Sequence, residues 1–149
     1  MHAMLRAAIG AGAEAAGIGS VARHPQPGAG KHGFDEVDQR TREALGKHGF
    51  GVLTEIDVQA TMKTKIGADM PGYRILGACN PTMAYKAIEL EPKVGAMLPC
   101  NVIVREQENG VVEVSAIDPV ASMQAIGNAE LQAVAGKVQA MLSDVVKAL

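Results

Sequence analysis

The chain has 149 residues, 48% of them hydrophobic, which suits one domain with a single core. Its 16 acidic and 14 basic residues form no long run of one sign, and it contains two Tyr, two Phe and no Trp. These features argue against nucleic-acid binding, which needs a basic surface or rings for base stacking. Glycines and charged residues interrupt every apolar stretch, so none reaches the roughly 20 apolar residues that are needed to span a membrane. We therefore expect a soluble, cytoplasmic protein.

Residues 1–30 are rich in Ala, Gly and Pro. Glu14 and several glycines interrupt the apolar stretch that a signal peptide would need. The segment His24-Pro25-Gln26-Pro27-Gly28 is typical of a linker. We expect a flexible extension over residues 1–30 and a single domain over residues 31–149.

The first regular pattern predicts a helix. Asp35 is placed to cap this helix and Gly49 to end it. One face of this helix is marked by residues spaced by three or four positions, namely Phe34, Val37, Thr41, Ala44, Leu45 and His48.

Residues 50–57 predict a strand with Val52, Thr54 and Ile56 on one face and Leu53, Glu55 and Asp57 on the other. Paired carboxylates can serve acid and base catalysis or bind a hard cation. Asp57 also stands where a helix over residues 58–66 needs its N-cap. Glu55 has no such structural role in the sequence, so it remains a candidate site residue.

The two cysteines stand in matching contexts, because each is followed by asparagine. A predicted strand over residues 73–78 leads into Cys79, Asn80 and Pro81, where Asn80 can cap a helix that extends to about Leu90. The positive end of that helix would favour a thiolate at Cys79. Cys100 precedes Asn101 at the start of another strand, where it could equally be a small buried hydrophobic residue.

We hypothesise that Cys79 and Cys100 lie within reach of each other at one end of a sheet. The chain has no Cys-x-x-Cys motif, and a zinc site would need two further ligands. Thiolates together with nearby thioethers from Met70, Met83 or Met97 would suit copper(I). Methionine more often fills gaps in an aliphatic core, so both interpretations stay open.

The C-terminal part predicts a hairpin and a long helix. Asn109-Gly110 is a hairpin signal between strands 97–105 and 111–117, and Asp118-Pro119 can start a short helix. Asn128 can cap a terminal helix. The apolar stripe of this helix consists of Leu131, Val134, Val138, Met141, Leu142, Val145 and Leu149. Together the patterns predict an α+β fold, with an antiparallel sheet covered by helices.

Three separated motifs carry a resemblance to a known family. They are Gly-Phe-Gly-Val-Leu-Thr-Glu-Ile-Asp at 49–57, Tyr-Arg-Ile-Leu-Gly-Ala-Cys-Asn-Pro at 73–81 and Leu-Pro-Cys-Asn-Val at 98–102. Together with Ala-Ile-Asp-Pro at 116–119, they resemble the domain of unknown function 302 family, from about Phe34 to Leu149. The resemblance implies strand, helix, four strands and helix, often as a homodimer, with no established activity. It also implies a first strand, for which Gly19 to His24 is the substitute found here.

Two classes of function follow for the site candidates Glu55, Asp57, Cys79, Asn80, Cys100 and Asn101. The first is a binding or accessory domain that holds a small ligand or soft metal near Cys79 and Cys100. The second is a thiol-dependent enzyme or redox protein that uses Cys79. A third interpretation is a purely structural homodimer. The sequence identifies no cofactor.

Overall fold

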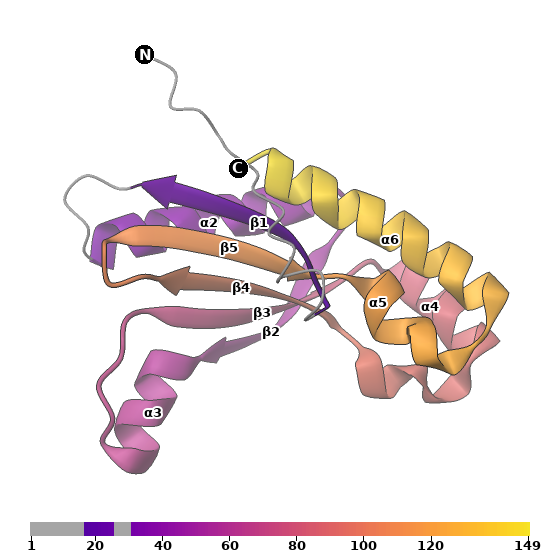
Figure 1. Cartoon of the computed structure of the whole chain (residues 1–149), viewed down its shortest axis with the longest axis horizontal. Helices are drawn as coiled ribbons and strands as arrows, with labels where there is room; N and C mark the ends of the chain where they lie inside the picture. Colours follow the sequence, from indigo (N-terminus) through magenta and orange to yellow (C-terminus); the bar gives the residue numbers. More distant parts are fainter. Residues whose placement is uncertain (1–16, 26–30) are drawn as a thin grey trace.

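A five-stranded antiparallel sheet forms the centre of the structure, a computed structural model that describes residues 17–25 and 31–149 (Figure 1). The strand order is β1-β5-β4-β3-β2. The strands are β1 (Ile18–Pro25), β2 (Gly51–Asp57), β3 (Tyr73–Cys79), β4 (Cys100–Glu106) and β5 (Val111–Ile117). The helices are α2 (Lys31–Lys47), α3 (Val58–Ile66), α4 (Pro81–Leu90), α5 (Pro119–Met123) and α6 (Ala129–Lys147), with short 3-10 helices η1 (Pro92–Met97) and η2 (Gln124–Ile126).

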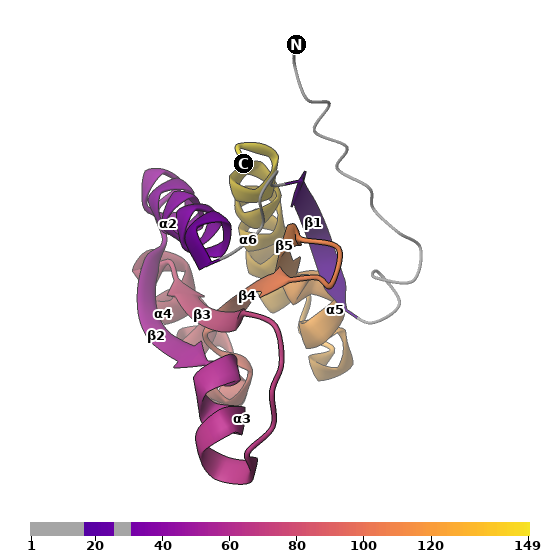
Figure 2. The same ribbon diagram turned by 90° about the vertical axis from the view of Figure 1, so that its left-hand side faces the viewer.

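The main core lies between one face of the sheet and the helices α2 and α6 (Figure 2). Leu45 of α2 and Leu142 of α6 are almost completely buried there. They pack in the same cluster as Leu76 and Val102 of the sheet, which are also fully buried. Burying a side chain of this kind stabilises the fold by about 1.5–3 kcal/mol. The predicted α+β fold, with helices over an antiparallel sheet, is confirmed.

An Asp or Asn side chain caps the N-terminus of four of the helices, because it accepts a hydrogen bond from a backbone N–H in the first turn. These caps are Asp57 for α3, Asn80 for α4, Asp118 for α5 and Asn128 for α6. Pro81 and Pro119 follow two of them in the first turn, where a missing N–H costs nothing. All four caps agree with the sequence-based prediction.

The start of α2 differs from that prediction. The helix begins at Lys31, so Asp35 lies inside it and is not its N-cap. Asp35 instead forms an ion pair with Arg74 of β3. The predicted end is correct, since Gly49 follows the helix with a φ of 84°, a conformation that favours glycine.

Strand β2 contains a β-bulge, which makes the predicted division of its faces wrong for Val52, whereas Thr54 shares a face with Ile56 as predicted. Val52 lies opposite Ala78 of β3, and Thr54 lies opposite the next residue, Gly77. Leu53 is therefore an extra residue in β2, and the side chains change faces across it. Val52 packs against the core, whereas Thr54 belongs to the opposite face.

The predicted extension over residues 1–30 contains a strand. Residues 18–25 form β1, which pairs antiparallel with β5 at the edge of the sheet. The weak signal at Gly19 to His24 therefore did mark the first strand that the family resemblance implies. The remainder of the predicted extension, residues 1–16 and 26–30, lies outside the described residues.

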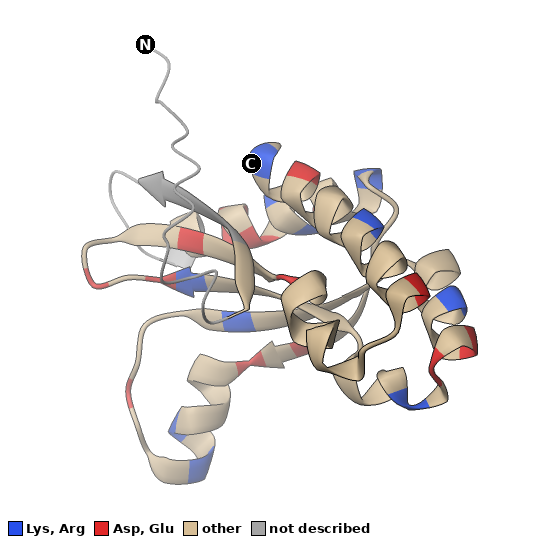
Figure 3. Ribbon diagram, turned by 45° about the vertical axis from the view of Figure 1, so that its right-hand side comes forward, with Lys and Arg blue, Asp and Glu red and all other residues tan. Residues whose placement is uncertain are grey.

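Charged residues of both signs are spread over the described elements (Figure 3). In the ranges that the structure describes, no helix is both long and apolar enough to cross a membrane.

Gly77 provides a test of the packing between β2 and β3. A Cβ atom at this position would overlap Thr54 Oγ1 and lie 2.7 Å from Pro99 Cγ. We expect Gly77→Ala to lower the free energy of unfolding by about 1–3 kcal/mol, measured by urea denaturation.

Gly51→Ala is the matched control, because nothing lies within 4 Å of a Cβ placed there in β2. This variant should be nearly neutral. Adding Thr54→Ala to Gly77→Ala should recover part of the loss. Equal stability of the two glycine variants would contradict the packing described here.

Candidate functional site

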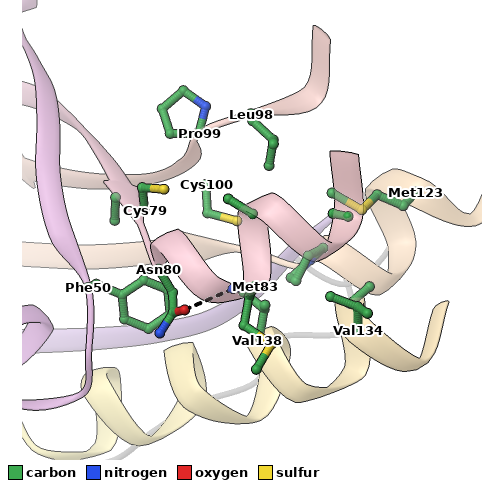
Figure 4. Close-up of a pocket in the computed structure, with 15 residues that line it drawn as sticks. Phe50, Cys79, Asn80, Met83, Leu98, Pro99, Cys100, Met123, Val134 and Val138 are labelled. Atoms are coloured by element: carbon green, nitrogen blue, oxygen red, sulfur yellow. Dashed lines mark hydrogen bonds between the residues drawn. The ribbon is translucent and has the colours of Figure 1, made fainter. Parts of the chain in front are cut away.

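The two cysteines lie at the same end of the sheet, as we expected. Ala78 at the end of β3 lies opposite Cys100 at the start of β4, and Cys79 is the next residue in β3. Both cysteines are free and line one cavity, which is closed by residues of α4, α5 and α6 (Figure 4). The antiparallel register of β3 and β4 therefore brings the two thiols to one place.

The cavity is apolar and rich in sulfur. Besides the cysteines, its lining includes Met83 of α4 and Met123 of α5, together with Phe50 and other hydrophobic residues. Its volume is about 30 Å³. That is room for one or two water-sized groups, whereas pockets for drug-sized ligands occupy about 300–1,000 Å³. The cavity can therefore hold a single ion or a very small molecule, but no larger organic ligand without opening.

Burial controls the protonation of the inner thiol. Cys100 is only 7% exposed. Desolvation, together with the smaller effect of the charge of nearby Cys79, raises its pKa from the ordinary value of 9.0 to about 11. Cys100 is therefore a protonated thiol at neutral pH.

Asn80 has a structural role beside the cavity. Its side-chain oxygen accepts a hydrogen bond of 3.0 Å from the backbone N–H of Met83, which caps α4. Its amide nitrogen donates a hydrogen bond of 3.0 Å to the carbonyl oxygen of Gly49. Asn80 thereby fixes the start of α4 against the loop that follows α2, and it also contributes to the cavity lining.

Asn101 does not join the cysteines. Successive residues of a strand point to opposite faces, so Asn101 faces away from the cavity that Cys100 lines. It is exposed and lines a separate, open pocket of about 580 Å³ with Ile103 and Ser115 on the other side of the sheet. The two Cys-Asn motifs thus resemble each other in sequence but differ in geometry.

Glu55 and Asp57 are also separate from the thiol cavity, and neither lines it. Glu55 forms ion pairs with Arg42 at 2.8 Å and with Arg74 at 3.8 Å. Asp57 accepts a hydrogen bond of 2.9 Å from the backbone N–H of Ala60, which is its capping role. The structure therefore gives both carboxylates partners within the fold.

Arg74 is the centre of a charged cluster that the sequence analysis missed. Its guanidinium lies 3.2 Å from Asp38, 3.1 Å from Asp35 and 5.0 Å from the centroid of the Phe34 ring. The side chain of Asp38 is 8% exposed and also pairs with Arg42 at 2.9 Å. The spacing of Asp38 and Arg42 by four residues was the available sequence signal.

The soft donors at the cavity are sulfur atoms. Across residues 17–25 and 31–149, no group of three or more His, Cys, Asp or Glu side chains could hold a metal ion. Met83 and Met123 supply the additional soft donors beside the two cysteines. Of the three methionines suggested by the sequence, Met83 alone lines the cavity, and Met123 was missed because α5 approaches through tertiary packing.

The fold and the site define a small two-layer α+β domain with two thiols that line one cavity. A family model for a domain of unknown function, DUF302, matches residues 29–149, and the chain belongs to this family. The fold is similar to the crystal structure of an uncharacterised conserved DUF302 protein from Bacillus stearothermophilus. The TM-score is 0.76 at 22% sequence identity, and the match covers 86% of this chain and 94% of that one. No curated protein matches the chain.

The charged cluster gives a prediction for stability. Arg74→Leu removes the cation that faces the buried carboxylate of Asp38, so we expect the free energy of unfolding to fall by about 2 kcal/mol, less than for a fully buried pair because the guanidinium is partly exposed. Arg40→Leu is the control, because Arg40 pairs with Glu36 on the exposed surface. Its effect should stay below about 0.5 kcal/mol. Thermal and urea unfolding would measure the stability of both variants. An equal loss of stability in Arg74→Leu and Arg40→Leu would contradict a stabilising role for the cluster.

The burial of Cys100 gives a prediction for reactivity. In a Cys79→Ser variant, iodoacetamide should modify Cys100 slowly near pH 7, with a rate that rises towards pH 11 as the thiolate forms. The raised pKa also makes the stability of the folded state depend on pH. Its contribution to the free energy of unfolding is fully present below pH 9.0 and is lost as pH rises towards about 11. Mass spectrometry over a pH series would measure the rate. A fast reaction at neutral pH would show that the thiol is accessible and ionised.

Proposed function

We propose that this chain is a small binding or accessory domain that holds a soft metal ion, such as copper(I), between Cys79 and Cys100. The observation that carries the proposal is the sulfur-rich cavity of about 30 Å³, whose lining includes Cys79, Cys100, Met83 and Met123. Thiolate and thioether ligands suit copper(I), zinc and iron–sulfur centres. Zinc would need two further ligands of the Cys, His, Asp or Glu kind, so copper(I) fits this donor set best.

The size of the cavity favours an ion over an organic ligand. A cavity of about 30 Å³ has no room for a ligand that needs hundreds of Å³. A bound cation also offsets the cost of ionising Cys100, whose pKa burial raises to about 11. Metal binding would therefore release protons, and its affinity would rise with pH.

The second candidate is a thiol-dependent redox function. It is favoured by the two free thiols that line one cavity. In such a reaction Cys79 attacks a small disulfide and releases one thiol, and Cys100 then displaces the second thiol to close the Cys79–Cys100 disulfide. Two electrons pass to the small disulfide, which leaves as two thiols. For either function we place the protein in the cytoplasm, where thiols stay reduced.

The test is a titration of reduced protein under anaerobic conditions with copper(I) buffered by a coloured chelator. We expect one copper(I) per chain, with affinity that rises by up to about a hundredfold per pH unit because the protons of both thiols are displaced. Cys79→Ser and Cys100→Ser should each abolish this binding, and Met83→Leu should weaken it.

Met97→Leu is the matched control, because Met97 is 39% exposed and does not line the cavity. Its affinity should equal that of the parent chain. Copper(I) binding that persists without both cysteines would overturn the metal proposal. If the chain binds no copper(I) but oxidised glutathione converts both thiols to a disulfide, the redox function is supported. If the chain neither binds copper(I) nor forms the disulfide, Cys79 and Cys100 have only a packing role.

A further inference from the structure

A pocket of ligand size lies on the face of the sheet opposite the thiol cavity. Its volume is about 580 Å³ and it is open to solvent. Pockets for small organic ligands occupy about 300–1,000 Å³, a range that includes this pocket but not the thiol cavity of about 30 Å³. We call it the Asn101 pocket, and the residues of its lining used below are Gly17, Ile18, Asn101, Ile103, Ser115 and Gln124.

The Asn101 pocket and the thiol cavity are neighbours with separate linings. Cys100 lines the thiol cavity and the next residue of β4, Asn101, lines the Asn101 pocket, because side chains alternate along a strand. Helix α5, which follows β5 at this end of the sheet, contributes to both (Figure 1). Met123 of α5 lines the thiol cavity, whereas Ala121 and Ser122 line the Asn101 pocket.

Hydrogen bonds around Asp118 hold the elements of the Asn101 pocket together. The carboxylate of Asp118 caps α5 by accepting hydrogen bonds from the backbone N–H of Val120 at 2.9 Å and of Ala121 at 3.3 Å. It also accepts a hydrogen bond of 2.9 Å from the side-chain amide of Gln139 in α6. The backbone N–H of Asp118 donates a hydrogen bond of 2.7 Å to the carbonyl oxygen of Gly17. The pocket is therefore largely pre-formed, as small-molecule sites usually are.

Ser115 brings a buried hydroxyl group to the Asn101 pocket. The residue is only 4% exposed, and it lies opposite Ile103 of β4. Within the described parts of the chain, its hydroxyl group makes no hydrogen bond to another residue. A buried polar group without a partner costs free energy, so a ligand that forms a hydrogen bond with Ser115 removes that cost.

Two amide side chains supply further hydrogen-bonding groups. Asn101 and Gln124 are exposed, and neither side chain is hydrogen-bonded to another residue in the ranges that the structure describes. The other three asparagines of the chain differ in this respect. Each accepts a hydrogen bond from a backbone N–H, which gives Asn80, Asn109 and Asn128 a structural role. Asn101 has no such role, so its amide is available to a ligand.

The lining of the Asn101 pocket indicates the charge of its ligand. Among the described residues, no Asp, Glu, Lys, Arg or His lines the pocket. A charged ligand would therefore lose part of its hydration without gaining a partner of opposite charge, which is costly. Ile18 and Ile103 provide apolar contact surface instead. Apolar surface with a few converging polar groups is typical of a site for an uncharged organic molecule.

We propose that the Asn101 pocket binds a small uncharged organic molecule that carries an amide or hydroxyl group. The polar group of the ligand forms hydrogen bonds with Asn101 and Ser115, and its apolar part lies against Ile18 and Ile103. Gln124 adds a further donor and acceptor at the exposed side of the pocket. This site is separate from the proposed soft-metal site and does not rest on it.

The experiment is an NMR titration of the full chain with three probes of similar size and different charge. The probes are cyclohexanecarboxamide, cyclohexanecarboxylate and cyclohexylmethylammonium. Cyclohexanecarboxamide should shift the side-chain amide signals of Asn101 and the methyl signals of Ile18 and Ile103. We expect it to bind about tenfold or more tightly than either ion, because the pocket offers no partner for a charge.

Two alanines allow a matched comparison of variants. Ala121 lines the pocket, whereas Ala125 is exposed in η2 and lies outside it. Ala121→Leu fills part of the pocket and should weaken the binding of cyclohexanecarboxamide by about tenfold or more. Ala125→Leu adds the same bulk outside the pocket and should leave the affinity unchanged. Circular dichroism checks that both variants fold.

Asn101→Asp tests the polar group without a change of size. The carboxylate has lost the amide donor, so cyclohexanecarboxamide should bind about three- to tenfold more weakly. The new charge should strengthen the binding of cyclohexylmethylammonium by about two- to fivefold.

Three results would overturn the proposal. They are equal binding of the carboxylate and the amide, unchanged binding of cyclohexanecarboxamide to Ala121→Leu, and no shift at the pocket residues with any probe up to its solubility limit. Cys79→Ser should leave the affinity for cyclohexanecarboxamide unchanged, because Cys79 lines the thiol cavity and not this pocket. Failure of the Asn101 pocket is thereby distinguished from failure of the soft-metal site.

Discussion

The pairing of β3 with β4 is the constraint on which the other features depend. With Ala78 opposite Cys100, the two cysteines come to the same end of the sheet. The same register places Leu76 against Val102 in the core and Ile75 against Ile103 on the opposite face. Because side chains alternate along a strand, a slip by one residue would exchange the two faces and destroy the core and the cavity together.

Local patterns in the sequence were sufficient for most of the fold. Apolar residues at helical spacing predicted α2 and α6, and Asp or Asn at a helix start predicted α3 to α6, because these signals act within one turn of chain. The prediction failed where the structure depends on distant pairing. The bulge at Leu53 is determined by the register of β2 with β3. Residues 18–25 form a strand because they pair with β5 at the edge of the sheet. Asp35 seemed a helix cap only while the start of α2 was unknown.

The candidate site could be predicted in part for the same reason. Two Cys-Asn motifs at strand ends predicted that the two cysteines lie close together. The pairing of β3 with β4 brings both cysteines to the same end of the sheet. The sequence could not indicate that Asn101 faces the other side of the sheet from the cavity, or that Met123 of α5 completes its lining. Glu55 looked unsatisfied because its partners, Arg42 and Arg74, come from α2 and β3. Contacts between elements that are distant in the chain carry no local signal.

The bulge in β2 has a consequence for the length of the chain. Val52 and Thr54 already lie opposite adjacent residues of β3, so Leu53 has no partner of its own in the ladder. Its side chain is 67% exposed and contributes little to the core. A protein that lacked this residue could keep each cross-strand pair of β2 and β3, with a straighter edge strand. Position 53 is therefore a place where evolution can change the length of a strand by one residue without reversing its faces.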